Sequence, residues 1–205
     1  MSERAPQDVA LDVSHLPPMA LSTSALLWWG IVGFVVIEGT AFAFLITVAL
    51  YLRYELAAWP PPHVPPPDLT LPVIGVVLLL ASLVPMHRSE KATERGDRAA
   101  TLLWLGAGTA LGLAFVAVRI VIWASLPFDW KDHAYGSIVW TLLGLHTLHL
   151  GTELAESLVV GVLLALGYWR DEQRLSVLTT GAYWDFVVLG WIPVFAVLYL
   201  LPHWG

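Results

Sequence analysis

Five long apolar segments alternate with shorter polar connections along the chain. The segments cover approximately residues 25–52, 69–86, 99–125, 135–169 and 177–201. A helix needs about 20 apolar residues to cross the hydrocarbon core of a bilayer, and each segment reaches or nearly reaches that length. The pattern predicts an all-α fold class, namely an integral membrane bundle of five transmembrane helices.

The connection between the first two segments is rich in proline. It reads WPPPHVPPPD, residues 59–68, and proline excludes a regular helix there because it fixes φ and lacks a backbone N–H. Residues 1–24 contain Asp, Glu and Pro but no apolar signal core, which predicts a polar N-terminal tail without a cleaved targeting peptide. No internal repeat is visible, so residues 25–205 are expected to form a single five-helix transmembrane domain.

Positive charges are distributed unevenly over the four connections. The second and fourth connections carry the larger number, namely Arg88, Lys91, Arg95, Arg98, Arg170 and Arg174. The first and third carry only Arg53 and Lys131. Because connections rich in Lys and Arg stay in the cytoplasm, we expect a cytoplasmic N-terminus and a periplasmic C-terminus.

The composition agrees with a membrane protein. Hydrophobic residues make up 58% of the chain and charged residues 13%, compared with about 25% charged residues in soluble domains. The 11 Trp residues suit a chain that places amphipathic rings at lipid headgroups. The absence of Cys excludes disulfides and thiolate metal sites. A net charge of −6 without a basic run argues against binding to nucleic acid.

Seven ionisable side chains fall well inside the predicted spans, where charge is unfavourable. They are Glu38, Arg119, His146, His149, Glu153, Glu156 and Asp185. Four of them belong to the fourth span, and at about 100° per residue these four occupy an arc of roughly 80° on one helix face. We expect this polar stripe to face the bundle or a partner protein and to avoid lipid.

Two of the seven residues carry separate expectations. Glu38 lies near the middle of the first span, where a carboxyl group must be protonated, paired or hydrated. Its position makes it a candidate for modification by a hydrophobic carbodiimide. Arg119 lies in the outer half of the third span and is expected either to extend its charge outward or to pair with a carboxylate.

The residues alone leave three interpretations of the polar stripe open. It is a structural seam of hydrogen bonds between helices, a metal site, or a set of groups that handle protons or contact lipid. Di-metal sites in helical bundles take Glu and Glu-x-x-His residues from several facing helices. Here His-x-x-His precedes the two Glu, and only Glu38 and Asp185 offer carboxylates elsewhere. We therefore predict no metal, cofactor or catalytic site in this chain.

Several blocks, in the same order and at similar spacing, resemble subunit III of the haem-copper terminal oxidases. They are VVIEGTAFAF (35–44), LLLASLVPMHRSEKATERGDRAA (78–100), LGLAF (111–115), LPF (126–128), YGSIVWTLLGLHTLHLG (135–151) and AYWDFVVLGWIPVFAVLYL (182–200). The full-length family has seven helices, and this chain resembles a five-helix form that lacks the first two. The chain has Arg119 where relatives often have Gln, and Asp185 where they usually have His.

The resemblance implies an accessory subunit in aerobic respiration, located in the bacterial cytoplasmic membrane and carrying no redox centre or active site of its own. It implies oxidase subunits I and II as partners, with haem and copper in those partner subunits. It also implies support for proton uptake by subunit I, stability during turnover, and bound phospholipid. Relatives use arginines near the cytoplasmic end of the fourth span to hold lipid phosphate, which points to Arg170 and Arg174.

Two alternative functions remain at this point. One is a subunit III-like partner of nitric oxide reductase, which would have the same fold. The other is an independent proton-coupled membrane carrier. Carriers commonly show repeated halves or broken helices near the membrane centre, and the sequence shows neither.

Overall fold

The structure is a computed structural model and describes residues 23–204, which are almost entirely helical and contain no strand. The helices are α1 (Thr23–Glu55), α2 (Thr70–Glu94), α3 (Arg98–Ala124), α4 (Ala134–Ala165) and α5 (Asp171–Phe195), followed by η1 (Ala196–Leu200) and η2 (Leu201–His203). Five helices in this part of the chain are long and apolar enough to cross a membrane. The predicted fold class is therefore confirmed. The predicted tail, 1–24, lies almost wholly outside the described residues.

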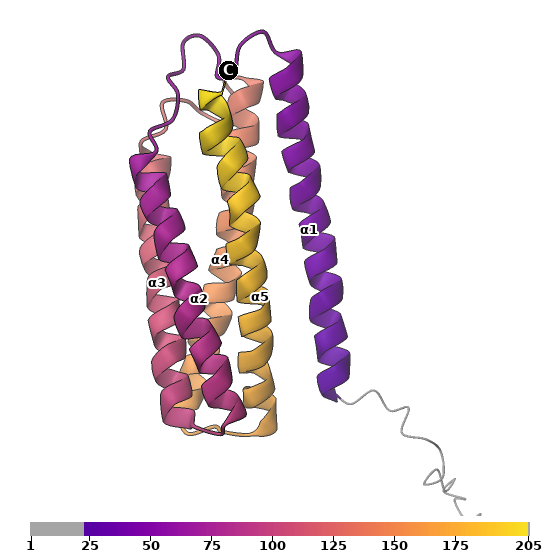
Figure 1. Cartoon of the computed structure of the whole chain (residues 1–205), viewed down its shortest axis with the longest axis vertical. Helices are drawn as coiled ribbons and strands as arrows, with labels where there is room; N and C mark the ends of the chain where they lie inside the picture. The colour runs from indigo at the N-terminus through magenta and orange to yellow at the C-terminus, as the bar shows by residue number, and fades with distance from the viewer. Residues whose placement is uncertain (1–22, 205) are drawn as a thin grey trace, which may run out of the picture.

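Helices α2 to α5 form a compact group, and α1 lies at its edge (Figure 1). Within the group, α5 packs against both α2 and α4, and α3 packs against α2 and α4. Helix α1 contacts α4, α5 and the short η1 turn. Many large apolar side chains of α1 are exposed, including Trp29 at 64% and Phe44 at 67%. Such a surface suits contact with lipid tails.

The short α2–α3 connection is specified by three consecutive residues. Gly96 takes a positive φ of 76°, which glycine adopts without the steric cost of a Cβ. The Asp97 side chain then accepts a hydrogen bond from Ala100 N at 3.0 Å and caps α3. Arg98 donates from Nε to the Leu164 carbonyl at 2.8 Å, and this carbonyl at the end of α4 also accepts from Gly167 N at 3.1 Å. The connection therefore fixes both a turn and the position of a neighbouring helix.

The connections gather at two ends of the bundle. The α2–α3 and α4–α5 connections lie at one end, and the α1–α2 connection, the α3–α4 connection and the C-terminus lie at the other (Figure 1). Arg174 Nη2 donates to the Thr93 carbonyl at 3.3 Å and so ties the start of α5 to the end of α2. The arginine-rich connections are thereby brought together at one end.

Candidate functional site

The residues of the predicted polar seam do not form one continuous network. The structure divides them into four places, each at a different junction between helices. Glu38 and His149 join α1 to α4, Glu156 joins α4 to α5, and Asp185 joins α5 to α2. His146 and Arg119 lie together in an aromatic cluster between α3, α4 and α5. Glu153, the remaining residue of the set, is buried in α4.

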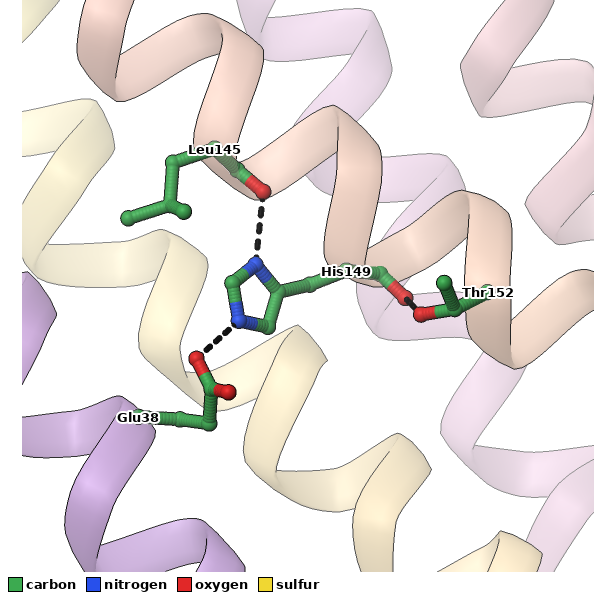
Figure 2. A network of polar contacts seen from close by, with 4 residues as sticks. All are labelled: Glu38, Leu145, His149 and Thr152. Atoms are coloured by element: carbon green, nitrogen blue, oxygen red, sulfur yellow. Dashed lines mark hydrogen bonds and ion pairs between the residues drawn. The ribbon is translucent and has the colours of Figure 1, made fainter.

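The junction between α1 and α4 is a hydrogen-bonded Glu–His pair (Figure 2). His149 Nδ1 contacts the Leu145 carbonyl at 2.6 Å. A carbonyl can only accept, so the proton on this nitrogen belongs to the imidazole. Nε2 faces the Glu38 carboxyl, so the pair is either a neutral imidazole with a protonated acid or an imidazolium with a carboxylate. Either way, one proton is shared between the two side chains.

The surroundings of the Glu–His pair differ on its two sides. The His149 side chain is 8% exposed and the Glu38 side chain 21% exposed. The ring of Phe42, one turn after Glu38 on α1, packs against the imidazole with ring centres 5.1 Å apart. Thr152 Oγ1 donates to the His149 carbonyl at 2.8 Å (Figure 2). The imidazole is therefore held in place, whereas the carboxyl keeps some access to the surface of the bundle.

The two glutamates of α4 have different environments. Thr180 Oγ1 donates to Glu156 Oε1 at 3.1 Å, which links α5 to an exposed residue of α4. Glu153 is 1% exposed, and neither of its carboxyl oxygens has a hydrogen-bond partner among the described residues. A buried carboxylate without a partner is costly, so the neutral acid is the favoured form of Glu153 in this setting.

Asp185 pairs with His87 of α2, with 2.9 Å between Oδ2 and Nε2. Both side chains are partly exposed, at 34% and 46%. Sequence reasoning singled out Asp185 but not its contact with His87, because 98 positions separate the two residues along the chain. It also missed Thr180, for which no local signal exists. Asp185 therefore belongs to a separate junction on the opposite side of α5 from Glu38.

The expectation for Arg119 is wrong in both of its forms. The residue is 1% exposed, so its charge does not reach the surface. Among residues 23–204, the ion pairs join His87 to Asp185 and His149 to Glu38, and none involves Arg119. Its guanidinium carbon instead lies 3.9 Å from the ring centre of Trp191. Arg119 therefore makes a cation–π contact with the buried indole of Trp191 and not the expected ion pair with a carboxylate.

The two arginines predicted to hold lipid differ from each other. The Arg170 side chain is exposed, and its backbone N–H donates to Gln173 Oε1 at 3.2 Å at the start of α5. Arg174 is partly buried and bonds to Thr93. Of the two arginines, Arg170 is the one that presents an exposed side chain at this position.

No group of three or more His, Asp or Glu side chains among the described residues is arranged to hold a metal ion. The titratable side chains inside the described bundle therefore occur singly or in pairs. Such an arrangement can stabilise contacts between helices and is chemically able to exchange protons.

Comparison with known proteins gives consistent matches. The sequence model for cytochrome c oxidase subunit III matches residues 7–205. A Synechocystis sp. protein named cytochrome c oxidase subunit 3 is 31% identical over 185 residues, which covers 86% of this chain and 76% of the relative. Proteins of the same name from Wickerhamomyces canadensis and Cyprinus carpio are each 27% identical, and the matches cover 97% and 93% of this chain and 75% and 73% of the relatives.

Proposed function

The chain belongs to the cytochrome c oxidase subunit III family, and from this premise we propose how it serves its oxidase. As a family member it is a multi-pass membrane protein and an accessory subunit of a haem-copper oxidase. We propose that it packs against subunits I and II in a bacterial cytoplasmic membrane, and that haem and copper are held by those partners. Its task is to support the catalytic subunit through repeated turnover.

The observation that carries this proposal is the Glu38–His149 pair, which shares one proton inside the membrane region. A shared proton in a place of low dielectric is suited to proton exchange. The half of the bundle with the arginine-rich connections contains further titratable groups, namely His87, Asp185 and Glu156. These features support a role for the subunit in sustaining proton uptake by subunit I.

We propose that the end of the bundle with the arginine-rich connections is cytoplasmic. The support is the positive-inside rule together with the fold, because the α2–α3 and α4–α5 connections lie at the same end (Figure 1). The N-terminal end of α1 lies at this end as well, and the C-terminus lies at the other. This orientation also places Arg170 at the level of the cytoplasmic headgroups, where its guanidinium suits lipid phosphate.

Purification of the tagged chain from its own membrane tests the proposal. We expect haem-bearing subunits to co-purify and the complex to consume oxygen. A matched preparation with a tag on an unrelated membrane protein controls for carry-over. Recovery of the chain alone as a stable protein, with no haem absorbance in the preparation, would contradict the proposed partnership.

A further inference from the structure

Arg119 is a buried cation without an anionic partner. It lies on α3 with 1% of its surface exposed, and no carboxylate among the described side chains forms an ion pair with it. Arginine stays protonated in proteins, so its positive charge persists in the interior. An uncompensated buried charge is strongly unfavourable. Because the side chain is enclosed by its own chain, an acidic side chain on the surface of a neighbouring subunit does not contact it directly.

The polar atoms around Arg119 are mostly hydrogen-bond donors that lack acceptors. Arg119 Nε and Nη1 and the indole Nε1 of Trp191 are buried and have no partner within the described residues. The two side chains are in contact, with 3.9 Å between the guanidinium carbon and the indole ring centre. The His146 ring centre lies 4.5 Å from that of Trp191. His146 Nε2 donates to the Val187 carbonyl at 3.1 Å, and its Nδ1, an acceptor in the neutral ring, has no partner among the described residues.

A cavity of about 510 Å³ lies near this cluster, at the end of the bundle with the proline-rich connection. Ile122, one turn after Arg119 on α3, lines the cavity together with Tyr199. The Tyr199 and Trp191 rings are in contact, with centres 6.3 Å apart, so Tyr199 borders both the cavity and the cluster. Asp68 is the one carboxylate in the lining. Neither Arg119 nor Trp191 lines the cavity, so a small solute would reach them from it past the Tyr199 ring.

We propose that Arg119 and Trp191 form a binding site for a small monovalent inorganic anion of the halide class, reached through this cavity. Water could accept hydrogen bonds from the unpartnered N–H groups, but a neutral molecule could not compensate the positive charge of Arg119. A weakly hydrated anion suits the site because the guanidinium is itself weakly hydrated and most of the cavity lining is apolar. A multivalent anion would leave a net negative charge in the interior and is disfavoured.

Bromide is the probe, and the sample is the purified oxidase complex that contains the full chain. Crystals soaked in bromide should show an anomalous peak within hydrogen-bond distance of the Arg119 guanidinium. Dialysis at constant ionic strength should show one saturable site that chloride competes for and phosphate does not. An Arg119 surrounded only by water, without anomalous signal, would overturn the proposal.

Two variants and a control make the test specific. Arg119→Gln removes the charge and keeps a polar side chain, and it should weaken bromide binding by at least about tenfold because charge-assisted hydrogen bonds are lost. Trp191→Phe keeps the aromatic face and removes the N–H, and it should weaken binding several-fold even if Arg119→Gln does not assemble. Arg88→Gln is the control, because Arg88 also stacks on an indole, that of Trp104 at 4.6 Å, but is exposed. Unchanged affinity in either site variant overturns the assignment.

Discussion

At the scale of single residues, the Glu38–His149 pair is the contact through which α1 supplies a titratable group to the bundle. The Leu145 carbonyl holds the proton on Nδ1 of His149, so Nε2 is left to exchange a proton with the carboxyl. The carboxyl is 21% exposed on its side chain, whereas Glu153 is 1% exposed as a residue. The two acids therefore differ in access, although both lie in the membrane region.

This difference in access predicts the outcome of labelling with a hydrophobic carbodiimide, which reacts with protonated carboxyl groups. Peptide mass spectrometry of the treated complex should find the adduct on Glu38, and Glu38→Gln should remove most of the modification. Glu153→Gln serves as the matched control and should leave the adduct on Glu38 unchanged. The interpretation of Glu38 as a reactive acid fails if the adduct forms only elsewhere.

The polarity of these residues was predictable, but most of their partners were not. Helical periodicity placed His146, His149, Glu153 and Glu156 on one face, and the central position of Glu38 made it a candidate partner for that face. Which residue meets which depends on how far each helix is rotated and on which helix lies opposite. Arg119 is the clearest example of a partner that the sequence did not predict, because it contacts the Trp191 indole of α5 and not a carboxylate.

At the scale of helices, close packing of α3 depends on small residues. A Cβ added to Gly112 would lie 2.7 Å from Cη2 of Trp184 and 2.9 Å from Cδ2 of Leu154. Trp184 is fully buried, and its N–H donates to Ser82 Oγ at 2.9 Å. The indole therefore cannot move aside without losing a buried hydrogen bond.

We predict that Gly112→Ala lowers the stability of the chain within the complex by about 1–3 kcal/mol, the usual cost of overpacking a core. Gly106→Ala on the same helix is the control, because nothing lies within 4 Å of its added Cβ. That change should be neutral or stabilising by up to about 1 kcal/mol, since alanine favours helix over glycine. Thermal unfolding in one detergent measures both, and equal shifts in Tm would show that Gly112 is not a packing constraint.

The start of α5 gives a second prediction at this scale, concerning lipid. Arg170→Ala should remove a bound phospholipid in native mass spectrometry, because the exposed guanidinium is free to take the phosphate in a bidentate contact. Arg174→Ala should lower thermal stability instead, since Arg174 ties α5 to the Thr93 carbonyl of α2. An unchanged lipid count in the double variant would leave plain electrostatic anchoring as the role of both.

Helix ends were predicted less well than helix cores. The second apolar segment was expected to end at 86, but α2 continues through a charged stretch to Glu94. Similarly, α5 begins at Asp171, six residues before the predicted span that starts at 177. Hydropathy reports where the hydrocarbon ends, whereas the helix ends where caps and glycines stop it, as Gly96 and Asp97 do between α2 and α3.

At the scale of the whole molecule, the arrangement of the connections makes the topology testable. Single cysteines at Ala99 and Pro65, both exposed, lie at opposite ends of the bundle. In intact cells a membrane-impermeant maleimide should label Pro65→Cys, and Ala99→Cys should be labelled only after the membrane is opened. Because the chain has no native Cys, each signal belongs to one position. Labelling of both positions from outside would refute a cytoplasmic N-terminus.

The order of helices and the family could be read from the sequence, because length, hydropathy and the ordered blocks survive divergence. The position of α1 at the edge of the bundle could not, because its apolar pattern is similar to that of the buried helices. Its edge position leaves much of its surface uncovered by the chain itself. We expect lipid or a neighbouring subunit to cover that surface.

Deletion of the chain tests its place in the oxidase. No group of three or more His, Asp or Glu side chains among the described residues is arranged to hold a metal. His146 is hydrogen-bonded to the Val187 carbonyl, and His149 is hydrogen-bonded to Glu38. We therefore predict that a purified complex without this subunit keeps its haem absorbance and its initial rate of oxygen consumption.

The same deletion should reduce activity at high pH, because protons are then scarce and the complex loses the titratable groups that we propose support proton uptake from the cytoplasmic end. It should also shorten activity over many turnovers, since the helix and lipid surfaces proposed to protect subunit I are removed. Oxygen consumption followed to exhaustion at pH 7 and at pH 9 measures both effects. The Glu38→Gln complex is the informative comparison, because it keeps the helices and removes one shared proton. If only the deletion loses oxygen-consumption activity, the effect is due to packing and lipid. If Glu38→Gln shows a matching loss at high pH, the effect is due to the proton that Glu38 and His149 share.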